Sequence, residues 1–247
     1  MANPLRAVTP GIRRALRRAG IVVSRVGSPA DRATMEGAFR ALVARGHRPA
    51  TVIDIGASNG SWSGSLRPFL PDARYLLIEA QAIHEPALRA YCAAHANTSY
   101  VLAAAGDHVG KIHFDTSDPF GGVASDSAFA AHEAIVPMTT VDAAVAAAGL
   151  AAPYLIKIDT HGFELPILRG AAHTLSATEV VVMECYNFHI APEALTFDEM
   201  CGHMRGLGFR CIDLVCPLHR PLDDAFWQAD LVFVRGDRPE FTRRSYR

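Results

Sequence analysis

The stretch from Thr51 to Gly60 constrains the fold more than any other part of the chain. It reads T-V-I-D-I-G-A-S-N-G, which is a run of β-branched residues, an acid, and a turn bounded by glycines. Ser61 then opens an amphipathic segment, so the pattern predicts a buried strand, a tight turn and a helix. An α/β sheet uses such a turn, at the carboxyl end of a strand, to hold a ligand. The sequence therefore predicts an α/β fold with a ligand site at this turn.

Strand and helix patterns alternate along the rest of the chain. Apolar and β-branched runs predict strands at 51–55, 75–79, 99–104, 154–158 and 179–184. Helical patterns separate most of them, including one at 164–175, and this alternation is typical of a doubly wound parallel sheet. The last two predicted strands, 209–215 and 230–235, have no helix between them, so we expect an antiparallel pair at the sheet edge. The predicted fold is a mostly parallel sheet with an antiparallel edge strand.

Composition and pattern divide the chain into three parts. Residues 1–48 form a predicted N-terminal helical arm, whose first 30 residues carry six arginines and no acid. A basic helix of this kind packs on its own protein or lies peripherally on an anionic membrane surface. The main domain is predicted at 49–238, with a β-hairpin-like insertion at 106–139, and residues 239–247 form a tail.

Charge, hydropathy and cysteine content limit the classes of function. The net charge is −1, and the remainder of the chain carries −7 once the +6 of the first 30 residues is set aside. That remainder offers no phosphate-tracking surface for nucleic acid. No apolar run approaches the roughly 18–20 residues of a membrane span. The five cysteines show no C-x-x-C spacing, which favours reduced thiols and a cytoplasmic location.

Three kinds of ligand site are compatible with the glycine turn. The letters G-A-S-N-G match the G-x-S-x-G turn of serine hydrolases, with Ser58 as nucleophile, but no oxyanion element precedes them and Asp54 has no function in that scheme. A dinucleotide site needs G-x-G-x-x-G, and two of those glycines are missing. The third pattern is D-x-G-x-x-x-G, formed by Asp54, Gly56 and Gly60.

This third pattern resembles the first motif of class I S-adenosylmethionine-dependent methyltransferases. The resemblance implies that the loop folds around the methionine part of the cofactor, where glycine allows a close approach. Glu79 ends the next predicted strand, and an acid there can accept both ribose hydroxyls. Small residues after the third strand leave room for adenine, which Asp107 could recognise. The predicted cofactor-binding residues are Asp54, Gly56, Ala57, Ser58, Asn59, Gly60, Glu79, Ala80, Ala105, Gly106, Asp107 and Asp159.

A longer match narrows the family. Residues 155–171 read L-I-K-I-D-T-H-G-F-E-L-P-I-L-R-G-A and are similar to the K-I-D-x-[EQ]-G-x-E signature of FkbM-type methyltransferases. Further pieces in the same order extend the resemblance over residues 50–235, although His161 stands where that family usually has Glu or Gln. The resemblance implies a seven-stranded Rossmann-like sheet, S-adenosylmethionine as methyl donor, and O-methylation of a hydroxyl on a sugar, a glycolipid or a natural product.

The chemistry is expected where the fourth and fifth strands end. Asp159, His161 and Glu184 lie at or just past those carboxyl ends, which a doubly wound sheet places beside the ligand cleft. We predict that His161 is the general base, because an ordinary pKa near ~6.5 suits proton transfer at neutral pH. Asp159 is expected to orient His161 or the acceptor. No metal site is predicted, although a divalent ion on Asp159 and Glu184 stays an alternative.

Other functions were weighed against this one. A degenerate methyltransferase fold could serve as a binding or assembly module, but the intact glycine turn and Glu79 argue against that use. A nucleic-acid methyltransferase would carry an N/D-P-P-[YF] motif after the fourth strand, where this chain has D-T-H-G. We therefore expect a small-molecule or carbohydrate acceptor and no nucleic-acid partner. The sequence does not specify the oligomeric state.

Overall fold

The computed structural model describes residues 12, 15–16, 18, 26 and 28–246. Most of the predicted basic arm lies outside the described residues, and with it the prediction of contact with a membrane surface. In the part that is described, α2 (Pro29–Arg32) begins after Ser28 and α3 (Met35–Ala44) begins after Thr34. Both side chains accept a backbone hydrogen bond at the start of their helix. Within these ranges, no helix is long and apolar enough to cross a bilayer.

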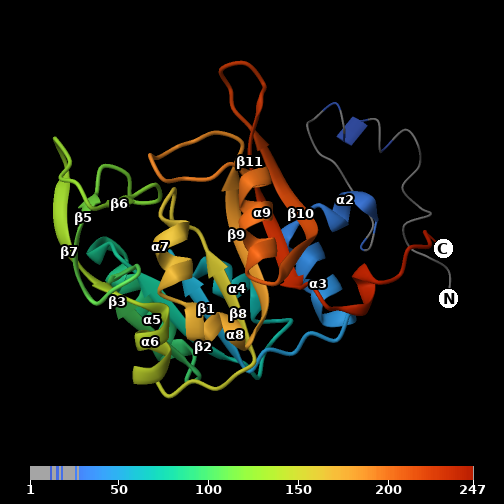
Figure 1. The fold of residues 1–247 in the computed structure, drawn as a ribbon, viewed down its shortest axis with the longest axis horizontal. Helices are drawn as coiled ribbons and strands as arrows, with labels where there is room; N and C mark the ends of the chain where they lie inside the picture. The colour runs from blue at the N-terminus through green and yellow to red at the C-terminus, as the bar shows by residue number, and fades with distance from the viewer. Residues whose placement is uncertain (1–11, 13–14, 17, 19–25, 27, 247) are drawn as a thin grey trace.

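A seven-stranded sheet forms the centre of the molecule, as the resemblance implied (Figure 1). In spatial order its strands are β10 (Phe209–His219), β11 (Phe226–Arg235), β9 (Thr178–Tyr186), β8 (Tyr154–Ile158), β1 (Thr51–Ile55), β2 (Arg74–Glu79) and β3 (Thr98–Leu102). The strands from β9 to β3 run parallel, and β11 is antiparallel to both of its neighbours. The predicted antiparallel pair is confirmed, with the reversed strand β11 one position in from the edge and β10 at the edge.

The closing pair of strands is longer than the sequence pattern indicates. Pairing continues past residue 215 as far as His219 opposite Phe226, across a register shift between Val215 and Leu218. Cys216 lies in this irregular stretch with a positive φ of 52°. Such a bulge accommodates Pro217, which has no N–H for the ladder. The proline therefore interrupts the strand without ending it.

Helices cover both faces of the sheet. Besides α3, they are α4 (Ser61–Leu66), α5 (Glu85–Ala94), α6 (Val141–Ala147), α7 (Glu164–Arg169), α8 (Ala172–Ser176) and α9 (Phe197–Gly206), and there are short 3₁₀ turns η2 (Ala82–His84) and η3 (Pro239–Phe241). The single helix predicted at 164–175 is wrong, because α7 and α8 are separate. Between them Gly170 packs so closely on the chain at Gly106 that a Cβ would lie 1.9 Å from the Gly106 carbonyl oxygen.

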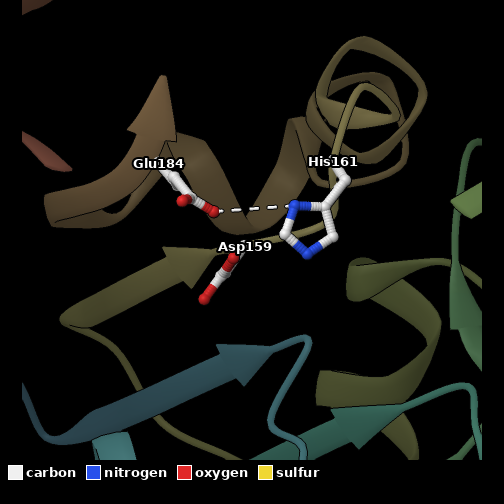
Figure 2. A group of neighbouring side chains, drawn as sticks. All are labelled: Asp159, His161 and Glu184. Atoms are coloured by element: carbon white, nitrogen blue, oxygen red, sulfur yellow. Dashed lines mark ion pairs between the residues drawn. The ribbon is translucent and has the colours of Figure 1, made fainter. Parts of the chain in front are cut away.

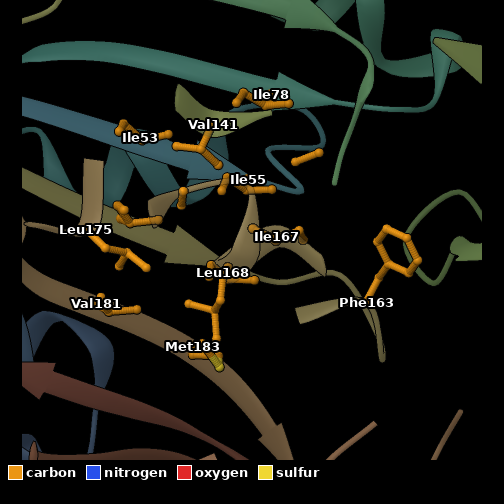
Figure 3. Close-up of a cluster of buried hydrophobic side chains, with 14 of the residues drawn as sticks. Ile53, Ile55, Ile78, Val141, Phe163, Ile167, Leu168, Leu175, Val181 and Met183 are labelled. Atoms are coloured by element: carbon orange, nitrogen blue, oxygen red, sulfur yellow. The ribbon is translucent and has the colours of Figure 1, made fainter. Parts of the chain in front are cut away.

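The core consists of two layers, one on each face of the sheet. Side chains alternate along a strand, so Ile53 and Ile55 of β1 enter the layer under α6 to α9, whereas Val52 enters the layer under α3 to α5. Figure 3 shows part of the first layer, in which Leu168 and Met183 lie near these isoleucines. Because both faces are covered, the central strands are nearly continuous apolar runs.

A second, smaller sheet occupies the predicted insertion. It contains β4 (Ala104–Ala105), β7 (Glu133–Thr139), β5 (Gly110–Asp115) and β6 (Val123–Ser125), in that spatial order. In Figure 1 it lies beside β3. The antiparallel neighbours β5 and β7 form the expected hairpin, whereas β6 has only three residues and is too short to show a periodic pattern. Residues 116–122, between β5 and β6, are called the strap below.

Candidate active site

A cavity of about 340 Å³ opens at the carboxyl ends of β1, β2 and β8. The glycine turn, Glu79, the alanines at 103–105, the strap and the segment from Lys157 to His161 all contribute to its wall. This is the position at which a doubly wound sheet binds its ligand. The sequence-based location of the site agrees with the cavity.

The glycine turn forms the wall at the end of β1. Gly56 has a φ of +71°, and a Cβ there would lie 2.0 Å from the carbonyl oxygen of Asp159, so only glycine fits between the two strand ends. Ala57 and Ser58 also line the cavity. The next two residues of the turn do not: Asn59 is exposed, and Gly60 faces Tyr91. Asn59 and Gly60 therefore lie outside the cavity wall, and their contact with the cofactor stays a prediction.

The Ser58 hydroxyl is not arranged as a nucleophile. Its oxygen is buried and, among the described residues, has no hydrogen-bond partner. A serine nucleophile requires a general base within hydrogen-bond reach, which Ser58 lacks in this part of the structure. The hydrolase interpretation of the turn is not supported by this geometry.

Glu79 is held with its carboxylate at the cavity wall. It is 6 % exposed, and its two oxygens accept the backbone N–H groups of Ser58 and Gln81, each at 2.7 Å. Each carboxylate oxygen can accept a further hydrogen bond. Glu79 thus presents a fixed hydrogen-bond acceptor at the cavity wall, which Ala80 and Ala105 also line.

Gly106 and Asp107, the residues of the adenine-binding prediction, lie apart from the cavity wall. The carboxylate of Asp107 pairs with Arg169 at 3.1 Å and with His108 at 2.9 Å, at the surface. The reason is that the chain enters the second sheet at this point, where Gly106 packs against Met138. The cavity wall is made by the small side chains just before it.

Asp54 lies behind the cavity and does not line it. It is fully buried, accepts a hydrogen bond from the Ser63 hydroxyl at 2.6 Å, and lies 3.1 Å from the ammonium of Lys157. Asp54 therefore lies outside the cavity wall, and its contact with the cofactor stays a prediction. Asp54 acts as a buried counter-ion for Lys157.

Lys157 links the first motif to the fourth strand, a role that no sequence motif indicates. Its buried Nζ donates to the carbonyl of Gly56 at 2.7 Å and lies 3.2 Å from the carboxylate of Asp159. Burial lowers the pKa of Lys157, but Asp54 and Asp159 outweigh this and hold the pKa above its usual range. The signal in the sequence was a lysine inside an otherwise apolar strand, because a buried charge needs partners.

Asp159 and Glu184 form a carboxyl pair with unequal proton affinities. Burial, and then the hydrogen bond and negative charge of Asp159, raise the pKa of Glu184 to about 9. Burial also raises the pKa of Asp159, but the charge of Lys157 and the hydrogen bond with Glu184 bring it below its ordinary value. At neutral pH the proton of the pair therefore resides on Glu184, and Asp159 is a carboxylate facing the cavity.

His161 completes this group, with both ring nitrogens occupied. One potential ligand atom from each of Asp159, His161 and Glu184 lies within 4.8 Å of the other two, and Figure 2 shows the three side chains converging. His161 Nε2 is 3.0 Å from the carbonyl oxygen of Phe120, and Nδ1 is 2.7 Å from the hydroxyl of Tyr186. A carbonyl only accepts, so Nε2 carries the proton and Nδ1 accepts from Tyr186 in the neutral ring. As a general base, His161 would first have to release Tyr186.

Side chains around the cavity hold the strap in place. Gln81 Nε2 donates to the carbonyls of Asp118 and Pro119 at 3.0 Å, and His84 Nε2 lies 2.6 Å from the Pro119 carbonyl. His161 provides the third attachment at Phe120. No motif marked Gln81 or His84 in the sequence, because their partners lie more than thirty residues away in the chain.

Comparison with known proteins adds an independent finding. The family model of the methyltransferase FkbM domain matches residues 54–211. No curated protein matches the chain.

Among solved structures, the fibrillarin pre-rRNA processing protein of Methanococcus jannaschii is similar with a TM-score of 0.49 and 13% identity, over 77% of this chain and 68% of that one. A precorrin-6y C5,15-methyltransferase from Geobacter metallireducens has a TM-score of 0.40 and 14% identity, over 81% of this chain and 87% of that one. An O-methyltransferase family protein from Burkholderia thailandensis has a TM-score of 0.42 and 12% identity, over 81% of this chain and 55% of that one.

The family match spans most of the chain and includes both the glycine turn and the cluster of Asp159, His161 and Glu184. The class I methyltransferase fold of that family implies S-adenosylmethionine as the methyl donor. The chain belongs to the FkbM methyltransferase domain family.

Proposed function

We propose that the protein transfers a methyl group from S-adenosylmethionine to a hydroxyl of a sugar, a glycolipid or a natural product. The observation that carries this proposal is the Asp159 carboxylate, which Lys157 keeps ionised and which faces the cavity beside the glycine turn. An alcohol must lose its proton during methylation, and a positioned base contributes about 10²–10⁴-fold to such a step.

The cavity residues are suited to the proposed cofactor. Glu79 can bind the ribose hydroxyls, and the backbone at Gly56 to Ser58 can approach the methionine part. The Ser58 hydroxyl and the Trp62 indole N–H belong to cavity-lining residues and are buried without a partner among the described residues. A buried polar atom without a partner is unusual, so small side-chain rotations toward a polar ligand would satisfy both. When bound, S-adenosylmethionine supplies an electrophilic methyl group on a sulfonium.

The chain itself provides proton transfer and positioning. The acceptor hydroxyl passes its proton to Asp159, while protonated Glu184 donates a hydrogen bond to that carboxylate. His161 has a positioning role, because its ring contacts Glu184 through one nitrogen and the carbonyl of Phe120 in the strap through the other. The sequence-based choice of His161 as base is thus replaced by a proposal for Asp159. An acidic wall of this kind also favours a neutral hydroxylated acceptor over a nucleic acid.

The proposal is tested by binding and by transfer. Calorimetry with S-adenosylhomocysteine should give saturable binding to the wild type. A labelled-methyl screen over free sugars, glycolipids and polyhydroxylated natural products should then find an acceptor. With that acceptor, Asp159→Asn should lower kcat by about a hundredfold or more, and should leave S-adenosylhomocysteine affinity within a few-fold.

Asp107→Asn is the matched control, because Asp107 is a nearby carboxylate outside the cavity. It should retain activity. Full turnover by Asp159→Asn would remove Asp159 as the base. A wild-type chain that does not bind S-adenosylhomocysteine would instead support the alternative of a degenerate fold used as a binding or assembly module.

A further inference from the structure

The cluster of Asp159, His161 and Glu184 has the spacing of a metal site. His161 Nδ1 and Glu184 Oε2 lie 3.7 Å apart. Two donors about 2.1 Å from a shared ion can lie up to about 4.2 Å apart. The widest pair in the cluster is separated by up to 4.8 Å, which exceeds that limit. A carboxylate would have to move by roughly a few tenths of an ångström to bring both donors to the ion.

The orientation of His161 is a second, independent observation. Its Nε2–H is held by the Phe120 carbonyl, which lies outside the cluster, so the lone pair of Nδ1 is directed to the side of Glu184 (Figure 2). Metal-binding histidines generally donate their other ring N–H to a backbone carbonyl or carboxylate in this way. The hydroxyl of Tyr186, the present partner of Nδ1, would have to release that nitrogen when an ion binds.

The charges around the cluster are unbalanced. Asp230 on β11 lies directly opposite Glu184 on β9, and Asp159 adds a third carboxyl group. Among the described residues, the ion pairs of these acids involve only Lys157 and His161, and Lys157 is shared with Asp54. A divalent ion would add positive charge here, and Glu184 would give up the proton that it shares with Asp159 when it becomes a ligand.

We propose that Asp159, His161 and Glu184 bind a divalent first-row metal ion, with Mn²⁺ as the best match to two carboxylates and one imidazole. The three side chains are only partly buried, with exposures of 37%, 22% and 12% in that order, and all line the cavity. Open coordination positions would face the acceptor, and an ion bound to a hydroxyl oxygen lowers the pKa of that hydroxyl. Binding of the ion does not depend on the proposed acceptor.

The test is a Mn²⁺ titration of chelator-treated protein, followed by the electron paramagnetic resonance signal of free Mn²⁺. S-adenosylhomocysteine is included, since it occupies the cofactor site without a sulfonium charge and its binding reports folding. One ion should bind per chain, and Glu184→Gln and Asp159→Asn should each weaken binding on the order of tenfold or more. Glu199→Gln is the matched control, because His189 and Glu199 are also 3.7 Å apart but exposed.

Saturable binding that both cluster variants weaken, and the control does not, would support the site. Absence of saturable binding, or equal affinity in folded Glu184→Gln, would overturn it. The proposed methyl transfer is judged separately. Turnover that persists in chelator would reject a catalytic ion while leaving the transferase function intact. Mn²⁺ binding by a protein for which no methyl acceptor is found would support the metal site while leaving the transferase function unsupported.

Discussion

Lys157→Met should destabilise the protein strongly, because Lys157 neutralises a carboxylate that water cannot reach. Asp54 has no exposed surface, and the Lys157 side chain is 6% exposed. Methionine preserves most of the volume but leaves Asp54 with the Ser63 hydroxyl as its remaining side-chain donor. Removal of one partner from a buried ion pair costs about 3–5 kcal/mol. At roughly 2–4 °C per kcal/mol for a chain of this size, the melting temperature should fall by about 6–20 °C.

Urea denaturation at constant pH measures this loss, and a double-mutant cycle assigns it to the pair. If the cost arises from the uncompensated charge, adding Asp54→Asn to Lys157→Met should recover a large part of the stability. Arg89→Met is a control, since Arg89 forms an exposed pair with Glu85, and exposed pairs contribute about 0–1 kcal/mol. A loss below about 1 kcal/mol for Lys157→Met, or strict additivity in the double variant, would refute the reasoning.

Three further predictions concern the site. Glu79→Gln should weaken S-adenosylhomocysteine binding by about tenfold or more, since charge-assisted hydrogen bonds contribute about 1.5–3 kcal/mol. Calorimetry should find the affinity of the control Asp107→Asn nearly unchanged. An equal loss of affinity in the two variants would reject the assignment of the ribose site. Burial and the charge of Asp159 raise the pKa of Asp230 to about 6, so its stabilising contribution is complete below the unfolded pKa near 3.8 and is lost as pH rises through 6. In metal-free protein, Asp230→Asn should therefore gain stability over wild type between about pH 4 and pH 8, on the order of 3 kcal/mol, and parallel denaturation curves across that range would contradict it. Gly56→Ala should separate the ends of β1 and β8, because its Cβ would lie 2.0 Å from the Asp159 carbonyl; loss of S-adenosylhomocysteine binding by calorimetry checks this, and wild-type affinity would disprove it.

Local patterns and strand topology were enough to predict the arrangement of the site. The run T-V-I-D-I and its glycine turn have the periodicity of a buried strand and its exit, and the structure has both. Glu79, Asp159 and Glu184 each end a predicted parallel strand. The carboxyl ends of parallel strands meet at one edge, and all three of these residues line the cavity there.

The direction of individual side chains could not be predicted in the same way. Asp107 follows a strand end like the others, but the chain enters the second sheet there and the carboxylate pairs with Arg169 at the surface. Asp54 is in the motif, yet it is buried behind the cavity. Both outcomes depend on which distant segment packs against the residue, and a local pattern carries no information about that.

The sequence alone thus determined the fold class, the place of the cavity and the residues at the strand ends, because periodicity and strand order are properties of the local chain. Only the tertiary structure decided that Lys157 joins Asp54 to Asp159, that Glu184 retains a proton beside an ionised Asp159, and that the strap holds His161 by its Nε2. The physical reason is the same in each case. Hydrogen bonds, ion pairs and pKa values depend on burial and on atoms brought together from remote parts of the chain.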